Sequence, residues 1–168
     1  MCAIAGEHSF DVVSRVDMAE VQNALTQAQR EVATRFDFRS GGAELALEAR
    51  EGRLTLGAED DQHLRSLLEL LTQRLAKRGV SLRALDISPP EPAAGGRRKQ
   101  IVALRVGIPA EKAKAMQKLL RDRKLKVTAQ IQDDQLRVFG DKKDELQAAI
   151  TLLRAEDYGI DLQFVNLR

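Results

Sequence analysis

The chain of 168 residues carries 27 Lys and Arg against 25 Asp and Glu, with 43% hydrophobic and 4% aromatic residues, one Cys and two His. A chain of this length can bury an apolar core without disulfides, and no stretch reaches the roughly 18 apolar residues of a membrane span. Because a single cysteine fits a reducing compartment and the N-terminus does not read as a signal peptide, we expect a cytoplasmic protein that does not bind membranes.

The first half of the chain predicts a strand, a helix, a hairpin, a second helix and a closing strand. Residues 9–14 form a short β run, and Asp17 begins a capping box for the helix after it. Residues 44–56 alternate in hydrophobicity across a turn and predict a hairpin. A leucine stripe then predicts a helix ending at Gly79, and residues 82–87 predict a strand.

A proline-rich segment, residues 88–99, follows and holds three of the four prolines, a composition typical of a linker. It also separates two halves of different charge. Residues 1–92 have a net charge of −4 and residues 93–168 one of +6. The excess of positive charge therefore lies in the second half.

The second half repeats the order of elements in the first. Residues 100–106 predict a strand, Pro109 the first position of a helix, and residues 126–139 a hairpin. Asp141 is expected to cap another helix, and residues 162–167 close the chain as a strand. The sequence therefore predicts a tandem βαββαβ repeat, an α+β fold of two ferredoxin-like domains whose helices cover one face of each antiparallel sheet.

The parts of most catalytic and cofactor sites are missing from the sequence. The glycines form neither a P-loop nor a dinucleotide-binding fingerprint. His8 and His63 lie far apart and Cys2 lies at the terminus, which leaves too few residues for a zinc site or a Cys/His nucleophile pair. We therefore expect no enzyme, no metal and no cofactor.

Alternation predicts which side chains of the second hairpin face away from the helices. This exposed face is basic and rich in amides, with one aromatic ring; it comprises Lys126, Thr128, Gln130, Gln132, Arg137 and Phe139. The equivalent face of the first hairpin is acidic or neutral. Only the second hairpin therefore suits a ligand that carries phosphate.

A basic segment lies beside that hairpin. Residues 112–126 hold seven basic residues and one acidic residue, and Lys114, Lys118 and Arg121 recur at helical spacing on one face. Such a face is either solvated or binds phosphates, and the sequence leaves both readings open. The small number of aromatic residues argues against binding of single-stranded RNA by base stacking. A base-stacking sheet uses two or three aromatic residues, and only Phe139 is present on this face.

Arg35 and Arg39 form a second candidate group after the first predicted helix. Two arginines at this spacing can clamp a guanine, and Asp37 between them could orient either one or cap a turn. The neighbouring Phe36 and Phe38 fit core positions better than base-stacking positions.

Seven blocks of sequence stand in the order found in a known family. They are residues 9–14, 31–39, 77–79, 124–132, 136–140, 144–148 and 162–168. Together they closely resemble the bacterial YajQ family of nucleotide-binding proteins over nearly the whole chain. The resemblance fails in residues 1–8 and in the segment 88–99, and Leu167 stands where the family pattern often has Phe.

The resemblance implies that the two ferredoxin-like domains exchange their N-terminal strands. Residues 16–108, including strand 100–107, would then form the first domain, and residues 1–15 with 109–168 the second. It also implies binding of purine nucleotides and of RNA such as tRNA, and in some members a role as an effector of cyclic di-GMP. No catalysis is implied.

The leading hypothesis is therefore a non-enzymatic binder of a purine nucleotide or of cyclic di-GMP, with regulatory output through another macromolecule. The alternatives are a general RNA-binding protein that uses the basic second domain, and a scaffold whose basic helix docks an acidic protein. The candidate nucleotide-binding residues are Arg35, Asp37, Arg39, Lys77, Arg78, Lys124, Lys126, Gln130, Arg137 and Phe139. The candidate phosphate contacts are Lys114, Lys118 and Arg121.

Overall fold

The structure is a computed structural model that describes residues 6–35 and 42–168. The chain forms two compact units. The continuous unit is Val16–Arg105, and the split unit combines Met1–Arg15 with Val106–Arg168. We expected Ile108 in the first domain. Its side chain is instead buried in the core of the split unit.

The continuous unit begins with helix α1, Met18–Thr34. Asp17 is its N-cap, as predicted, and the carboxylate accepts hydrogen bonds from the backbone N–H groups of Ala19 and Glu20. The remaining elements of the unit are β2 (Glu44–Glu48), β3 (Arg53–Ala58), α2 (Asp61–Lys77), the 3-10 turn η2 (Leu82–Ala84), β4 (Leu85–Ile87), β5 (Glu91–Pro92), the 3-10 turn η3 (Ala94–Gly96) and β6 (Arg98–Leu104). The strand expected at residues 82–87 thus begins only at Leu85.

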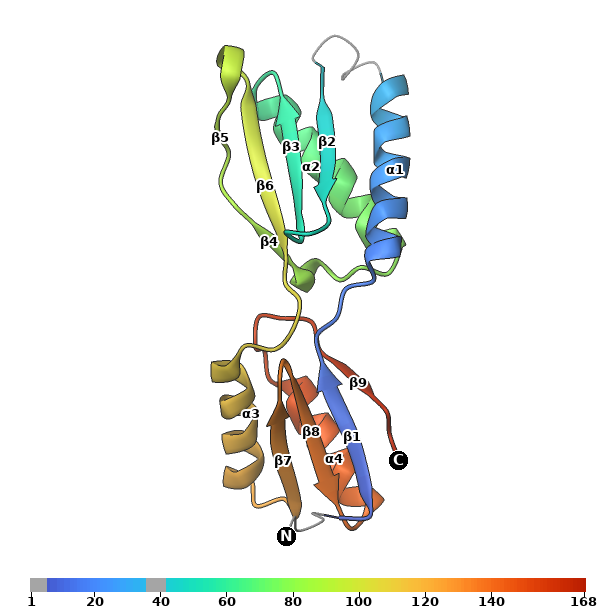
Figure 1. Ribbon diagram of the computed structural model, residues 1–168, viewed down its shortest axis with the longest axis vertical. Helices are drawn as coiled ribbons and strands as arrows, with labels where there is room; N and C mark the ends of the chain where they lie inside the picture. Colours follow the sequence, from blue (N-terminus) through green and yellow to red (C-terminus); the bar gives the residue numbers. More distant parts are fainter. Residues whose placement is uncertain (1–5, 36–41) are drawn as a thin grey trace. The chain divides into compact units, whose positions relative to one another are not determined.

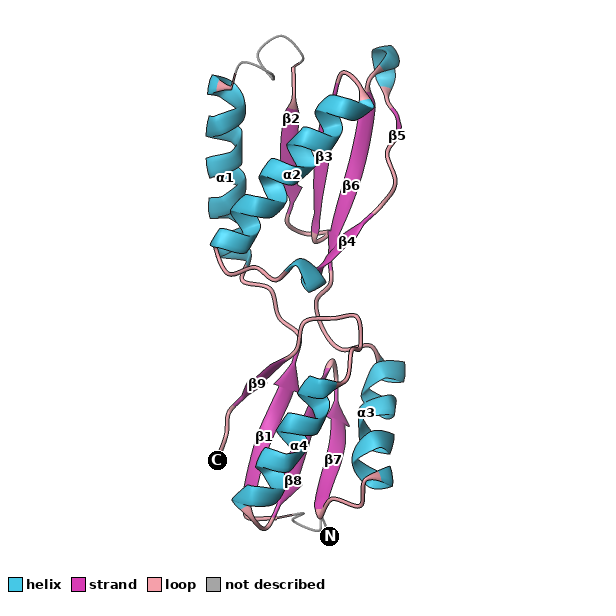
Figure 2. Ribbon diagram, turned by 180° about the vertical axis from the view of Figure 1, so that it is seen from behind, coloured by secondary structure: helices cyan, strands magenta, loops and turns pink. Residues whose placement is uncertain are grey.

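The sheet of the continuous unit is antiparallel, with the order β2-β3-β6-β4 (Figure 1). Leu54 and Leu56 of β3 and Val102 of β6 are fully buried against both helices. Alternate residues of the strands point away from α1 and α2, which both lie on one face of the sheet (Figure 2).

The segment 88–99 is not a linker between the units. It lies within the continuous unit, where β5 pairs with β6 in the register Glu91↔Lys99 and Pro92↔Arg98. Proline has no backbone N–H group to donate. An edge strand does not need that hydrogen bond on its open side, so prolines are tolerated at this position. The chain instead passes between the units at Arg15–Val16 and at Arg105–Val106.

The split unit has the sheet order β7-β8-β1-β9 (Figure 1). Its elements are β1 (His8–Val13), α3 (Ala110–Asp122), β7 (Val127–Gln132), β8 (Gln135–Gly140), α4 (Lys143–Ala155) and β9 (Gln163–Val165). β1 pairs with β8 and β9, and β6 pairs with β3 and β4. The fold is therefore α+β with two ferredoxin-like units, and the pairing confirms the exchange of N-terminal strands.

Two helix starts differ from the prediction by one residue. Pro109 is the N-cap of α3 rather than its first helical residue, because its ψ of 146° is extended. Lys142, not Asp141, occupies the N-cap position of α4, and no side chain caps that helix. Asp144 and Glu145 in the first turn instead supply negative charge at its N-terminus. Within the described part of the chain, no helix is both long and apolar enough to cross a membrane.

Candidate nucleotide-binding surface

The candidates of the continuous unit do not form one site. Arg35 is the C-cap of α1, and its backbone N–H donates to the Glu31 carbonyl oxygen over 2.8 Å. Asp37 and Arg39 lie outside the described residues, as do Phe36 and Phe38. Arg35 is thus the one member of the predicted arginine pair whose position the structure describes.

Lys77 and Arg78 end helix α2 at the opposite end of α1 from Arg35. Both are exposed, and the Arg78 guanidinium lies 3.8 Å from the carboxylate of Glu20, which stands in the first turn of α1. Because α1 has 17 residues, its ends are about 25 Å apart. A single nucleotide could not contact Arg35 and Arg78 together.

The open face of the split unit's sheet carries the predicted polar side chains. Arg137 pairs in register with Gln130 on one side and with Asp11 on the other, and Phe139 pairs with Thr128. The helix-facing residues of the same strands lie in the core, as alternation predicts: Val127, Ala129, Ile131, Leu136 and Val138.

Asp11 is a buried carboxylate on that face, and the sequence reasoning missed it. The Arg137 Nε donates to Oδ1 over 2.7 Å and Nη2 donates to Oδ2 over 3.3 Å, while Asn166 Nδ2 donates to Oδ2 over 2.8 Å. The hydrogen bonds from Arg137 hold the pKa of Asp11 below its usual value even though burial opposes this. The signal in the sequence is an acid within the otherwise apolar run Phe10–Val13, whereas its pairing with Arg137 depends on the strand register.

This pairing changes the role that Arg137 can play. The side chain of Asp11 is 3% exposed and that of Arg137 is 35% exposed, so the guanidinium lies fixed on the surface with two of its three nitrogens engaged. Arg137 therefore offers a fixed planar cation to a ligand rather than a flexible one.

The cations of α3 and the segment after it lie on the surface of the same unit. Lys114, Lys118, Arg121, Lys124 and Lys126 are all exposed, and none forms an ion pair with residues 6–35 or 42–168. Among the described residues, the one carboxylate that these five residues contact is Glu145, whose Oε2 accepts a hydrogen bond from the Lys126 backbone N–H over 3.4 Å. Five exposed cations without acidic partners give this surface a positive electrostatic potential that attracts anions.

Lys124 has an unusual backbone conformation. Its φ is 58°, and it ends α3 where Gly79, with φ 80°, ends α2. The same hydrogen bonds close both helices: Lys124 N–H donates to the Arg121 carbonyl and Gly79 N–H to the Ala76 carbonyl. Glycine is the usual residue in this left-handed position, so a lysine here is retained at a conformational cost.

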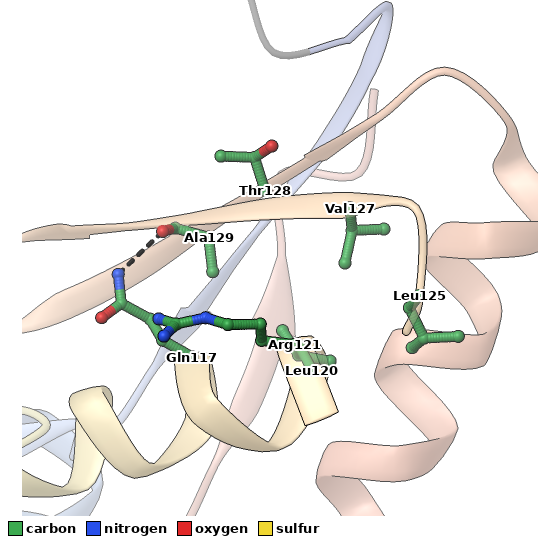
Figure 3. A pocket seen from close by; sticks show the side chains of 7 residues that line it. All are labelled: Gln117, Leu120, Arg121, Leu125, Val127, Thr128 and Ala129. Carbon is green, nitrogen blue, oxygen red and sulfur yellow. Dashed lines mark hydrogen bonds between the residues drawn. The ribbon is translucent and has the colours of Figure 1, made fainter. Parts of the chain in front are cut away.

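A pocket of about 250 Å³ lies between α3 and β7. Leu120, Leu125, Val127 and Ala129 form its apolar surface, with Gln117, Arg121 and Thr128 completing the lining. In Figure 3, Val127 and Ala129 point toward α3, Thr128 points to the other side of the strand, and Arg121 lies beside Gln117. The Gln117 amide donates to the Ala129 carbonyl oxygen over 2.8 Å. The pocket thus combines an apolar floor with a cationic rim.

The chain as a whole is similar to known proteins. The family model described as nucleotide-binding protein YajQ-like matches residues 8–168. The chain belongs to this YajQ-like family. Its relatives include proteins called "Nucleotide-binding protein" from Acidithiobacillus ferrooxidans, at 48% identity over 95% of this chain and 98% of the relative, and from Syntrophotalea carbinolica, at 49% identity over the same shares. A relative of that name from Carboxydothermus hydrogenoformans is 45% identical over 98% of this chain and 100% of its own.

Membership in the YajQ-like family confirms the resemblance seen in the sequence. The family description and the printed names of the relatives support nucleotide binding. They name neither the nucleotide nor the residues that hold it.

Proposed function

We propose that the split unit binds a purine nucleotide, with the base in the α3–β7 pocket and the phosphates on the cations beside it. The observation that carries this proposal is a pocket with an apolar floor that is rimmed by Arg121, with Lys124 next to it; neither cation forms an ion pair with another described residue. Ligand sites of this kind are mostly apolar with a few convergent polar groups, and phosphate is bound by unpartnered Arg and Lys.

The size of the pocket limits what enters it. Its volume of about 250 Å³ lies just below the roughly 300–1,000 Å³ of sites that enclose a whole drug-sized ligand. One base fits inside, and the sugar and phosphates remain at the rim. Cyclic di-GMP would place one guanine in the pocket and leave the second on the surface, where a partner protein or RNA could read it as a regulatory signal.

We propose binding rather than turnover. The seven lining residues include no carboxylate, imidazole or thiol, and arginine does not act as a base near neutral pH. An effector, whose output passes through another macromolecule, needs only binding and no chemistry.

Calorimetric titration with ATP, GTP and cyclic di-GMP tests the proposal. Wild type and the control Arg50→Ala, an exposed arginine in the other unit, should bind alike. Arg121→Ala and Lys124→Gly should each weaken binding about tenfold, because each removes one charge-assisted contact to phosphate. Equal affinities in all four proteins would place the site elsewhere.

RNA binding is a second candidate, favoured by the open sheet face beside the cations. Phosphates would contact Lys114 and Lys118, while single bases would lie over Arg137 and Phe139. Affinity for single-stranded RNA should then fall steeply with salt, and Lys114→Glu with Lys118→Glu should reduce the slope by about 0.7 for each lost phosphate contact. A salt-independent affinity would contradict RNA binding by this surface.

A further inference from the structure

A buried polar side chain breaks the apolar pattern of the continuous unit. Gln100 of β6 pairs with Leu56 and shares the helix-facing side of the sheet with Val102, yet it is an amide and only 6% exposed. Alternation predicts an apolar residue at this position. A buried polar group in an apolar row needs a reason, because burying an amide without partners is unfavourable.

The strand opposite Gln100 contains a bulge. Ser88 N–H donates to the Ile101 carbonyl over 3.0 Å, and the next pair along β6 is Lys99 with Glu91. Pro89 and Pro90 therefore both stand opposite Gln100, in the two-to-one count of a β-bulge. Prolines are compatible with such a place because neither can donate to the ladder.

A pocket of about 300 Å³ lies under the first turns of α2 at this bulge. Asp61, Arg65 and Leu68 line it from one stripe of the helix, and Pro90 and Gln100 line it from the strands. The volume lies at the lower end of the range for small-molecule sites. All five residues belong to the continuous unit, so this pocket is separate from the α3–β7 pocket.

The polar groups of this pocket differ in whether they already form hydrogen bonds or ion pairs. Gln100 Nε2 donates to the Ser88 carbonyl over 2.8 Å, and no described residue donates to its Oε1. Asp61 is held by Arg98 over 2.7 Å. Arg65 forms no ion pair with any residue within the described ranges. The pocket thus offers the Gln100 Oε1 acceptor, the Arg65 cation, the Asp61 carboxylate that is paired with Arg98, and the apolar surfaces of Leu68 and Pro90.

These groups define the ligand. It would donate a hydrogen bond to Oε1, because this oxygen accepts from no described residue while the Gln100 amide nitrogen is held at the Ser88 carbonyl. A negative charge on the ligand would meet Arg65, and an apolar or planar body would lie against Pro90 and Leu68. We propose that this pocket is a second ligand site that binds a purine mononucleotide with an exocyclic amino group, such as AMP. The choice of a nucleotide among ligands of this chemistry rests on the proposed function.

The test uses calorimetry on the full chain in an Arg121→Ala background, which weakens the α3–β7 pocket. AMP should still bind, and Gln100→Leu should weaken it roughly tenfold by removing the acceptor. The same substitution should leave purine riboside 5′-monophosphate, which lacks the amino group, unaffected. Arg65→Ala should weaken AMP but not adenosine, since only AMP carries the phosphate.

The chain provides a matched control for the loss of a glutamine. Gln29 lies in the same unit and donates to the Leu45 carbonyl over 2.8 Å, as Gln100 does to Ser88, but it lines neither pocket. Gln29→Leu should leave AMP affinity unchanged when it is measured at a protein concentration at which the variant is monomeric. Gln100→Leu should fold, because leucine suits the apolar row, and an unaltered far-UV spectrum checks this.

The two proposals fail in different ways. If Arg121→Ala abolishes AMP binding, or if AMP binds equally to Arg121→Ala and to Arg121→Ala with Gln100→Leu, the second site is overturned. If AMP affinity depends on Gln100 and Arg65 but no nucleotide responds to substitution of Arg121 or Lys124, the second site stands and the proposed function of the α3–β7 pocket fails.

Discussion

At the scale of single residues, the ion pair between Asp11 and Arg137 stabilises the split unit as well as fixing its surface. Asp11→Asn removes the charge from a carboxylate that is 3% exposed and accepts three hydrogen bonds. We expect the free energy of unfolding at pH 7 to fall by about 1–3 kcal/mol, since Arg137 is partly solvated and recovers some hydration. Urea unfolding of both proteins measures the difference.

The same pair predicts a pH dependence. The pKa of Asp11 is lowered in the native state, chiefly by Arg137, so its contribution to stability is present above the unfolded pKa near 4 and is lost as pH falls through the lower native pKa. The difference in stability between wild type and Asp11→Asn should therefore shrink below pH 4. A difference that stays constant from pH 7 to pH 2 would contradict the assigned pairing.

A substitution of Lys124 should change protein stability and nucleotide affinity in opposite directions. Lys124→Gly relieves a left-handed φ of 58° and should raise the free energy of unfolding by about 1 kcal/mol. Because the substitution also removes a cation beside the α3–β7 pocket, nucleotide affinity should fall. Thermal unfolding and calorimetry on the same preparations test both effects, and a glycine variant that is less stable or binds equally well would refute this interpretation.

At the scale of elements, a glutamine on the first helix of each unit covers the edge strand of its sheet. Gln29 of α1 donates to the Leu45 carbonyl of β2, and Gln117 of α3 donates to the Ala129 carbonyl of β7, each over 2.8 Å. Both strands are sheet edges, where exposed carbonyls invite pairing with another chain.

Gln29→Leu should therefore leave the Leu45 carbonyl without its side-chain donor. We expect a loss of about 1 kcal/mol of stability and increased self-association, because the edge of β2 is then open for pairing. Sedimentation velocity over a range of concentrations detects the association. A variant that remains as monodisperse and as stable as wild type would show that the hydrogen bond does not protect the edge.

The order of helices and strands could be predicted from the sequence because it depends on local periodicity, and the Asp17 cap is an example. The segment 88–99 could not, since its composition is equally compatible with a linker and with a bulged edge strand. The same limit applied to the candidate site. Side-chain type pointed to Arg121 and Lys126, but the partners of Arg137 and Gln100 depend on strand register.

At the scale of the whole molecule, the strand exchange makes the two units unequal. The continuous unit, Val16–Arg105, is one stretch of chain that holds all of its strands and both helices. The split unit takes β1, with Phe10 and Val12 in its core, from the far N-terminus. Hydrophobic periodicity does not predict strand exchange, because a strand has the same alternating pattern whichever sheet it joins.

A fragment experiment tests this inequality. Residues 16–105 should fold alone, with cooperative thermal unfolding followed by circular dichroism. Residues 106–168 should not, because without β1 their sheet lacks the strand between β8 and β9. Cooperative unfolding of the 106–168 fragment by itself would contradict the assignment of β1 to this unit's core.

The central claim is that a nucleotide binds between α3 and β7. Amide chemical-shift mapping on the labelled full chain, titrated with GTP and with cyclic di-GMP, locates binding without substitution. We predict that the largest shifts for at least one of these ligands lie at the end of α3 and the start of β7, from Gln117 through Ala129. Absence of shifts there at millimolar ligand, or shifts concentrated in other elements, would contradict it.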